Sequence, residues 1–130
     1  MKKTKVMIVD DEFEFAQPLS ERLALRDFET TTAGCAEDAM TLLRANWQPD
    51  VVVLDLRMPG LDGLDSLSLF KKFDPTMEVI IVSGHGSTAV GIEGMRRGLF
   101  DYLMKPVEID DLVQRIKAAA EKRREALANA

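Results

Sequence analysis

Three short apolar runs dominate the hydrophobic pattern of the chain. Each spans about four residues, is rich in β-branched side chains and is continuous rather than alternating. Such runs are typical of strands that are buried on both faces in the middle of a parallel sheet. They are Val6-Met7-Ile8-Val9, Val51 to Leu54, and Val79 to Val82. Two weaker segments, Glu29 to Thr32 and Tyr102 to Met104, are polar or brief, which favours edge strands.

Helical patterns fill the gaps between these strands. Apolar residues recur at helical spacing in three segments, around 36–46, around 64–73 and from about 108 onward. Strands that alternate with helices predict right-handed crossovers and a doubly wound α/β fold. Three central and two edge strands suit a five-stranded parallel sheet in the order 2-1-3-4-5, the flavodoxin-like (βα)5 arrangement. In that arrangement the ligand site lies at the carboxyl ends of the first and third strands.

Two of the expected helices have unfavourable residues. The first, around 14–26, contains Pro18, which lacks an N–H, so we expect it to start late or to have a distorted first turn. The other, from Thr88 to Arg97, contains two glycines and has a thin apolar face. Each glycine costs ~1 kcal/mol relative to alanine, so we expect this to be the least stable helix of the domain.

Acidic residues follow the first and third strands directly. Asp10 and Asp11 come after Val9, and Asp55 comes after Leu54. Aspartates in front of a helix often cap its free N–H groups, and for Asp10 and Asp11 alone that role would be an equal alternative. The repetition at Asp55 favours a cluster whose mutual repulsion a cation offsets. Mg²⁺ prefers oxygen ligands and suits one or two carboxylates plus a phosphate.

Two other strand ends carry polar residues that complete a phosphate-accepting site. Lys105 follows the fifth strand and precedes Pro106, a residue that can adopt a cis peptide bond in a tight turn. Its ammonium is expected to point at Asp55 or at a phosphoryl oxygen. Ser83 ends the fourth run, where its hydroxyl either caps the next helix or hydrogen-bonds a phosphoryl oxygen.

Composition and charge narrow the class of protein. The chain has 130 residues, of which 46% are hydrophobic and 30% charged, as expected for one globular domain. The net charge of −5 argues against a nucleic-acid-binding surface. No apolar run approaches the ~20 residues that cross a bilayer, so no membrane association is expected. The single cysteine, Cys35, fits a reducing cytoplasm.

The order of these motifs resembles the receiver domain of bacterial two-component response regulators. The resemblance covers Lys5 to about Ala120, with residues 121–130 left as a helical extension or the start of a linker. It rests on Asp10-Asp11, Asp55 within Asp-Leu-Arg-Met-Pro-Gly-Leu-Asp-Gly, Ser83 and Lys105-Pro106. Each motif is weak alone, but four of them in order at the right strand ends make a strong signal.

The resemblance implies a role for each of these residues. Asp55 would accept a phosphoryl group from a phosphohistidine of a sensor histidine kinase or phosphotransfer protein. Mg²⁺ would be bound by Asp11, Asp55 and the carbonyl of Arg57, with Asp10 acting through water. The phosphoryl group would be contacted by Lys105, by Ser83 and by backbone N–H groups near Arg57 and Gly84. Such a chain is not an enzyme in the ordinary sense, because it acts only on its own phosphate.

The resemblance also implies a switch. Ser83 would move toward the phosphoryl group, and the ring of Tyr102 would fill the vacated space. The surface of the weak helix, the fifth strand and the last helix would then signal to an unknown output partner or domain, or form a homodimer. Arg57 and His85 lie two residues after Asp55 and Ser83, and we expect them to tune the lifetime of the phosphate.

Two other functions remain open from the sequence. One is a magnesium-dependent phosphohydrolase with an aspartate nucleophile, although such enzymes usually carry a second carboxylate where this chain has Arg57. The other is a pseudo-receiver that binds partners without phosphate, although such modules tend to lose the acids, Ser83 and Lys105. A P-loop enzyme is disfavoured because no glycine-rich stretch ends in Gly-Lys-Ser or Gly-Lys-Thr.

Overall fold

Strands and helices alternate along the chain as predicted. The computed structural model describes residues 2–56, 62–84 and 86–130, and the statements below concern these residues. The strands are β1 (Lys5–Val9), β2 (Glu29–Ala33), β3 (Val51–Leu54), β4 (Glu78–Ser83) and β5 (Asp101–Met104). The helices are α1 (Phe13–Leu25), α2 (Ala36–Arg44), α3 (Gly63–Phe73), α4 (Thr88–Arg96) and α5 (Ile109–Ala128).

All of these strands pair in parallel, in the order β2-β1-β3-β4-β5. The predicted sheet order is therefore confirmed. The polar β2 and the short β5 lie at the two edges, while every residue of β3 and β4 is buried. Continuous apolar runs mark the central strands because both of their faces are covered by helices.

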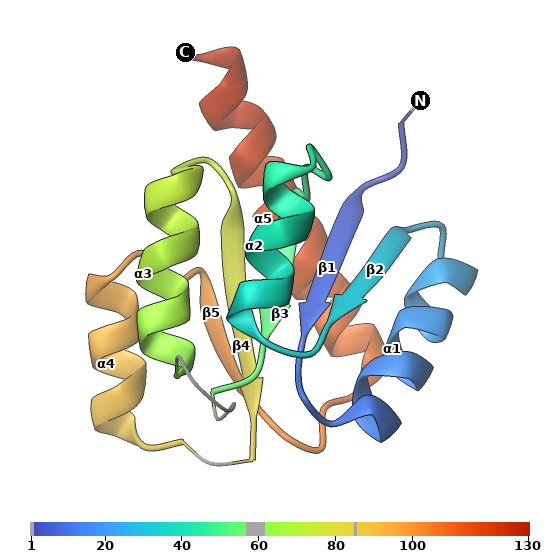
Figure 1. The fold of residues 1–130 in the computed structure, drawn as a ribbon, viewed down its shortest axis with the longest axis vertical. Helices are drawn as coiled ribbons and strands as arrows, with labels where there is room; N and C mark the ends of the chain where they lie inside the picture. Colours follow the sequence, from blue (N-terminus) through green and yellow to red (C-terminus); the bar gives the residue numbers. More distant parts are fainter. Residues whose placement is uncertain (1, 57–61, 85) are drawn as a thin grey trace.

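The helices form a layer on each face of the sheet (Figure 1). Successive residues of β1 point to opposite faces, so they enter two separate cores. Met7 and Val9 pack with α2 and α3, whereas Val6 and Ile8 pack with α1 and α5. The arrowheads of the strands point to the end of the sheet opposite both chain termini (Figure 1). The carboxyl ends of the strands therefore lie together at one end of the sheet.

The prediction that α1 starts late is wrong. The helix begins at Phe13, five residues before Pro18, and it continues through the proline. In its first turn the N–H groups of Phe15 and Ala16 both donate to the carbonyl oxygen of Glu12. One face of the helix buries Ala16, Leu19 and Leu23. That burial offsets the hydrogen bond lost at Pro18, because each large apolar side chain contributes about 2 kcal/mol.

α4 is attached to the domain less extensively than the other helices. Gly94 is its one buried residue, and Ile92 and Met95 are about half exposed. Its N-cap is Ser87, whose side chain accepts a hydrogen bond from the N–H of Val90. Little buried apolar area supports this helix, which agrees with the expectation of a weak element beside the predicted site.

α5 extends well beyond the sheet. It runs without a break to Ala128, so residues 121–128 continue the last helix as expected. Arg123 ties this extension to the body of the domain through Asp50 and Asp74. None of the described helices combines the length and the apolar character that a bilayer crossing requires.

Candidate phosphate-accepting site

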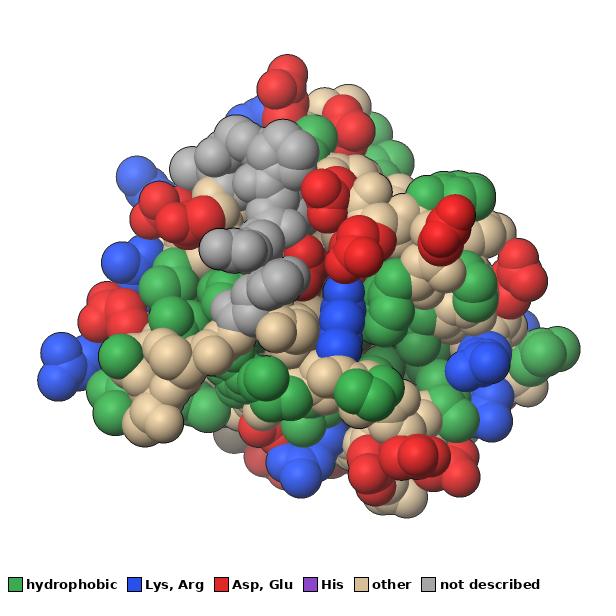
Figure 2. Space-filling model, turned by 90° about the horizontal axis from the view of Figure 1, so that it is seen from below, with side chains coloured by type: hydrophobic (Ala, Val, Ile, Leu, Met, Phe, Trp, Pro, Cys, Tyr) green, Lys and Arg blue, Asp and Glu red, His purple; other side chains and the backbone are tan. Residues whose placement is uncertain are grey.

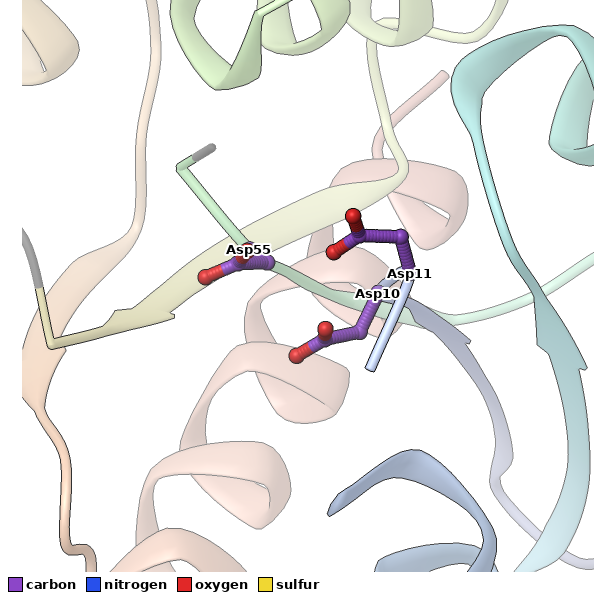
Figure 3. A group of neighbouring side chains, drawn as sticks. All are labelled: Asp10, Asp11 and Asp55. Atoms are coloured by element: carbon purple, nitrogen blue, oxygen red, sulfur yellow. The ribbon is translucent and has the colours of Figure 1, made fainter. Parts of the chain in front are cut away.

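The register of the central strands brings the predicted acids together. Val9 pairs with Leu54, and the next residues, Asp10 and Asp55, leave the sheet side by side. The N–H of Asp55 donates to the carbonyl of Val9 at 2.9 Å. Carboxylate oxygens of Asp10, Asp11 and Asp55 all lie within 4.8 Å of one another. Figure 3 shows the three side chains gathered at the ends of β1 and β3.

A glycine at the start of α3 lets this helix begin close to the backbone of Asp55 and Leu56. Gly63 begins α3, and its N–H donates to the carbonyl of Leu56 at 2.8 Å. A Cβ at this position would lie 2.6 Å from the Cα of Leu56 and 2.9 Å from the carbonyl oxygen of Asp55. Only glycine permits this approach, because the obstructing atoms belong to the backbone. The segment Asp62-Gly63 thereby holds the start of α3 against the residue that follows Asp55.

The environment of Asp10 and Asp55 disfavours the charged form of each. Asp10 and Asp55 are each only 4% exposed, whereas Asp11 is exposed. Burial raises the pKa of Asp10. Burial and the neighbouring charge of Asp10 raise the pKa of Asp55. The Oδ1 atom of Asp55 is buried and has no hydrogen-bond partner among the described residues, so this oxygen can still accept an electropositive group.

Lys105 lies among these acids. Its Nζ is 3.0 Å from Oδ2 of Asp10, 3.2 Å from Oε1 of Glu12 and 3.7 Å from Oδ1 of Asp55. Burial alone would lower the pKa of Lys105, but its hydrogen bond to Asp10 and the nearby negative charges outweigh burial and raise that pKa. Among the described acids, Asp10 is thus the closest to the Lys105 ammonium, and Asp55 forms a longer ion pair with it. The Lys105-Pro106 peptide bond is cis.

The strand pairing also brings Ser83 to the site. Ser83 is fully buried at the end of β4, and its carbonyl accepts the N–H of Lys105 at 3.0 Å. A Cβ on the next residue, Gly84, would lie 4.0 Å from the Cβ of Lys105. Tyr102 lies on β5 opposite Ile81 and is half-buried, with burial raising the pKa of its hydroxyl. The predictions about Arg57 and His85 concern residues outside the described part of the chain.

The alternative capping roles do not match the helix starts. The N-cap residue of α1 is Glu12, not Asp10 or Asp11, and no side chain makes a capping hydrogen bond there. Instead, Oδ1 of Asp10 accepts the N–H of Glu12 at 2.9 Å. α4 is capped by Ser87, so Ser83 does not serve as its cap. The polar residues at the strand ends therefore have positions that helix capping does not explain.

The acid cluster suits a hard divalent cation. The available ligands are carboxylate oxygens, and Oδ1 of Asp55 is buried without a hydrogen bond among the described residues. Asp11 is exposed to solvent, which would complete the coordination. Mg²⁺ favours such sites because it keeps several of its waters. Figure 2 looks onto this end of the sheet and shows acidic side chains gathered beside one end of a basic side chain.

Two residues at the site were missed from the sequence. Glu12 extends the acid pair to three consecutive acids, a signal that was visible in the sequence, and it reaches Lys105. Phe15 places its ring under the same ammonium, with Nζ 4.0 Å from the ring centroid. Phe15 lies one helical turn beyond Asp11, and no periodicity distinguishes it from an ordinary core residue.

Comparison with known proteins identifies the family. The response regulator receiver domain family matches residues 6–117. The chain belongs to this family. It is 35% identical over 127 residues to the C4-dicarboxylate transport transcriptional regulatory protein DctD of Pseudomonas aeruginosa, covering 98% of this chain. It is 36% identical over 108 residues to the regulatory protein AtoC of Escherichia coli, covering 83% of this chain.

Solved receiver domains share the fold. A response regulator receiver domain from Clostridium thermocellum is 34% identical with a TM-score of 0.87, and the match covers 95% of this chain and 98% of that one. The receiver domain of the Francisella response regulator 1452 is 35% identical with a TM-score of 0.84, with 92% and 98% covered. The recognised resemblance and the flavodoxin-like fold are therefore confirmed.

The chain spans only about a quarter of the length of these two curated relatives. It covers 27% of the DctD protein and 23% of AtoC. Receiver-domain membership thus holds for this chain, while the activities of those larger proteins belong to the proteins themselves.

Proposed function

We propose that this receiver domain accepts a phosphoryl group on Asp55 in a magnesium-dependent reaction. An oxygen of the Asp55 carboxylate attacks phosphorus, and the phosphorus–nitrogen bond of a donor phosphohistidine breaks. The electron pair of that bond stays on the imidazole, which is protonated as it leaves. The observation that carries the proposal is the buried Oδ1 of Asp55, which lacks a hydrogen bond among the described residues and lies 3.7 Å from Lys105. Carboxylates are established nucleophiles of this kind.

The neighbouring acids are suited to hold the metal. We assign Asp11 and Asp55 as direct ligands and Asp10 as a ligand through water, with the carbonyl of Arg57 as a further ligand. The hydrogen bonds of Asp10 to Lys105 and Glu12 support an indirect role for this side chain. When bound, Mg²⁺ supplies positive charge that neutralises the phosphoryl oxygens during transfer.

The remaining site residues stabilise or hydrolyse the phosphoryl group. Lys105 contributes an ammonium 3.7 Å from the acceptor carboxylate, and Ser83 contributes a hydroxyl from the neighbouring strand end. Backbone N–H groups near Arg57 and Gly84 complete the contacts. We infer that Arg57 and His85 set how long the acyl phosphate survives, since they lie two residues after Asp55 and Ser83 in the sequence.

We propose that phosphorylation changes the surface of α4, β5 and α5. An open groove of about 470 Å3 lies between α4 and β5 and is lined largely by apolar residues, including Ile92, Met95 and Met104. Tyr102 borders this groove from β5, and Ser83, which ends β4 at the site, pairs with Met104, another residue of the groove. Movement of Ser83 toward a phosphoryl group would draw the ring of Tyr102 inward and reshape the groove.

Gly86 makes this switch testable. A Cβ on Gly86 would lie 0.9 Å from the hydroxyl oxygen of Tyr102, whereas a Cβ on Gly91 would meet the same ring at 3.8 Å. Gly86→Ala should therefore displace the tip of Tyr102 without unfolding the domain, while Gly91→Ala should leave it in place. The chain contains a single tyrosine, so its ring signals in an NMR spectrum report the displacement directly.

The partners follow from the role. We propose a sensor histidine kinase or phosphotransfer protein as the donor, and an output domain or protein as the receiver of the signal, with a homodimer through α4, β5 and α5 as an alternative. One relative, 34% identical over 119 residues, is named the DNA-binding transcriptional regulator NtrC of Escherichia coli. We propose a transcriptional output on that basis, with no nucleic acid bound by this domain itself.

Organisation and location complete the proposal. Residues 1–120 form the receiver, and residues 121–130 are a helical extension or the start of a linker. We place the domain in the cytoplasm, where a donor kinase would present its phosphohistidine. The domain acts as a phosphoacceptor rather than as an enzyme with turnover on outside substrates.

A direct test uses a small phosphoryl donor. Incubation with Mg²⁺ and acetyl phosphate should add one phosphoryl group, seen by intact mass. Asp55→Asn should abolish the addition, while Asp38→Asn, at an exposed position on α2, should not. Wild-type protein that stays unmodified would overturn the proposal. Repeated turnover of a generic phosphate ester would instead favour the phosphohydrolase.

A further inference from the structure

The ammonium of Lys105 has two kinds of neighbour among the described residues. Three are carboxylates, from Asp10, Glu12 and Asp55, at 3.0 to 3.7 Å. The fourth is the face of the Phe15 ring, whose centroid lies 4.0 Å from Nζ. A cation over an aromatic face is attracted by the negative charge of the ring face. The lysine is therefore held by acids on one side and by a neutral ring on another.

The two kinds of contact respond differently to a bound metal. Any divalent cation at the acid cluster shares the carboxylates of Asp10 and Asp55 with Lys105 and repels its ammonium. The acids then hold the lysine less strongly. The ring of Phe15 carries no net charge and is no ligand for a hard cation, so its attraction for the ammonium persists. Among the described neighbours of Lys105, Phe15 is thus the one that still holds the ammonium in place when the carboxylates bind a cation.

The fold fixes Phe15 in this position. Its backbone N–H donates to the carbonyl of Glu12 at 2.9 Å, in the first turn of α1. Its side chain is half-buried and packs against the core that α1 and α5 share. Val107 and Ile109, from the segment that follows Lys105, line a small cavity together with the same ring. Phe15 therefore connects the first turn of α1 with the segment that carries the lysine.

We propose that Phe15 is a positioning residue that holds the Lys105 ammonium over the acceptor site. The kinetic consequence rests on the phosphoacceptor function proposed for Asp55, whereas the contact itself does not. Phe15 does not touch the phosphoryl group and acts only through Lys105. Loss of the aromatic face should let the lysine sample other rotamers, and the reaction should slow in proportion to the time it spends away from the site.

The first test observes the contact by NMR. Protons on the ε-carbon of Lys105 lie close to the ring face, so the ring should shift their resonances upfield. Phe15→Leu should move these resonances to ordinary lysine values, and Phe15→Tyr should retain the shift. Phe13→Leu is the matched control, because Phe13 lies two residues earlier and is 69% exposed. The upfield shift should survive the addition of Mg²⁺ in wild-type protein.

The second test measures function separately from folding and metal binding. Phe15→Leu should reduce the rate of phosphorylation by acetyl phosphate about fivefold, the size expected for one cation–π contact. Phe15→Tyr should restore the rate, and the Kd for Mg²⁺ should stay unchanged in both. A Lys105 resonance that is the same in wild type and Phe15→Leu would overturn the proposal, whether or not the protein is phosphorylated.

The two measurements separate the possible failures. If the resonance shifts as expected but no variant or wild type is phosphorylated, then the function of Asp55 is wrong and the lysine contact stands. If the wild type is phosphorylated and Phe15→Leu reacts at the same rate, the positioning role is wrong. If Phe15→Leu loses its dispersed amide spectrum, Phe15→Tyr and Phe13→Leu still test the ring contact, because loss of the upfield shift of the Lys105 resonances in either variant would contradict it.

Discussion

The two ends of the parallel sheet both carry acidic side chains, but they balance the charges differently. At the amino end, Asp50 and Asp74 share Arg123, which lies 2.8 Å and 3.5 Å from them. Glu78 is 2% exposed and has an ammonium on each side, Lys71 and Lys122, both at 3.7 Å. At the carboxyl end, Asp10, Asp55 and Glu12 share one ammonium among the described residues.

The difference separates a structural network from a binding site. Each end holds one buried carboxylate oxygen without a hydrogen bond among the described residues, in Glu78 and in Asp55. The oxygen of Glu78 lies 3.7 Å from the ammonium of Lys71, and the other oxygen of the same carboxylate lies 3.7 Å from that of Lys122, so the negative charge is compensated. The oxygen of Asp55 lies in an excess of negative charge that a cation can still relieve. Burial of an acid alone therefore does not mark a functional site, whereas an unmatched set of acids does.

The largest effect is expected at the amino end of the sheet, which we call the matched end because each of its acids has a cation beside it; the carboxyl end is the unmatched end. Arg123→Met removes the cation shared by Asp50 and Asp74 and should lower the free energy of unfolding by about 2 kcal/mol, because two partly buried carboxylates lose a charged hydrogen-bond donor. Urea denaturation of the metal-free protein measures the change. Arg124→Met is the control: this side chain is 53% exposed, so its removal should cost less than about 0.5 kcal/mol. Equal costs at the two positions would show that the network is not structural.

The second effect should appear only at the unmatched end. Mg²⁺ binds the folded acid cluster and not the unfolded chain, so it should stabilise the domain. At ten times its Kd the expected gain is about 1.4 kcal/mol. Thermal denaturation with and without Mg²⁺ measures it. Asp11→Asn should reduce the stabilisation by Mg²⁺. Arg123→Met should show the full stabilisation by Mg²⁺, although its free energy of unfolding without metal is lower. No shift of the melting temperature in wild type would contradict metal binding.

A third effect has opposite signs at the two ends. Without metal, Asp55→Asn should raise the free energy of unfolding at pH 7 by ~1 kcal/mol, because it removes a buried charge that repels Asp10. Glu78→Gln should lower it, because two lysines lose their partner. The folded-state pKa of Asp55 is raised, so its ionisation destabilises the native state as pH rises through that pKa. The gain in stability from Asp55→Asn should therefore fade as pH falls toward 3.8, the ordinary pKa of an aspartate.

Urea titrations of the two variants at several pH values measure this difference. A destabilised Asp55→Asn protein at pH 7 would mean that the carboxylate is already satisfied by neighbours. In that case the carboxyl end would resemble the amino end, and the contrast between them would disappear.

Much of this site was predictable because its residues lie at strand ends. Val51 to Leu54 is a continuous apolar run, and that run alone placed Asp55 at the carboxyl edge of a buried strand. Strand order then brought Asp10 next to Asp55 and Lys105 next to Ser83. Periodicity carries this information because it reports which backbone segments are buried.

Other features depend on side-chain directions that no periodicity reports. The choice of Asp10 over Asp55 as the closest partner of Lys105 depends on rotamers. The contact of Phe15 with the same lysine joins α1 to the end of β5, and only the assembled fold brings them together. Pro18 misled the prediction of α1 because the penalty for proline is local, whereas the burial of Leu19 and Leu23 is tertiary.

The smallest effect distinguishes the two lysines around Glu78. Lys122 is 61% exposed and lies 3.7 Å from Glu78, so Lys122→Met should cost at most about 0.5 kcal/mol, since solvent and salt screen such a pair. Lys71 is less exposed and also donates to the carbonyl oxygens of Pro75 and Met77 at 2.8 Å and 3.0 Å. Lys71→Met should therefore cost more, about 1 kcal/mol, because it also removes a hydrogen-bond donor from two carbonyls. Urea denaturation in low and high salt tests this, because only the cost of Lys122→Met should shrink toward zero as salt rises. If the costs of both substitutions shrink alike, then both lysines contribute only charge attraction that salt screens, and Arg123 is the main stabilising cation at this end of the sheet.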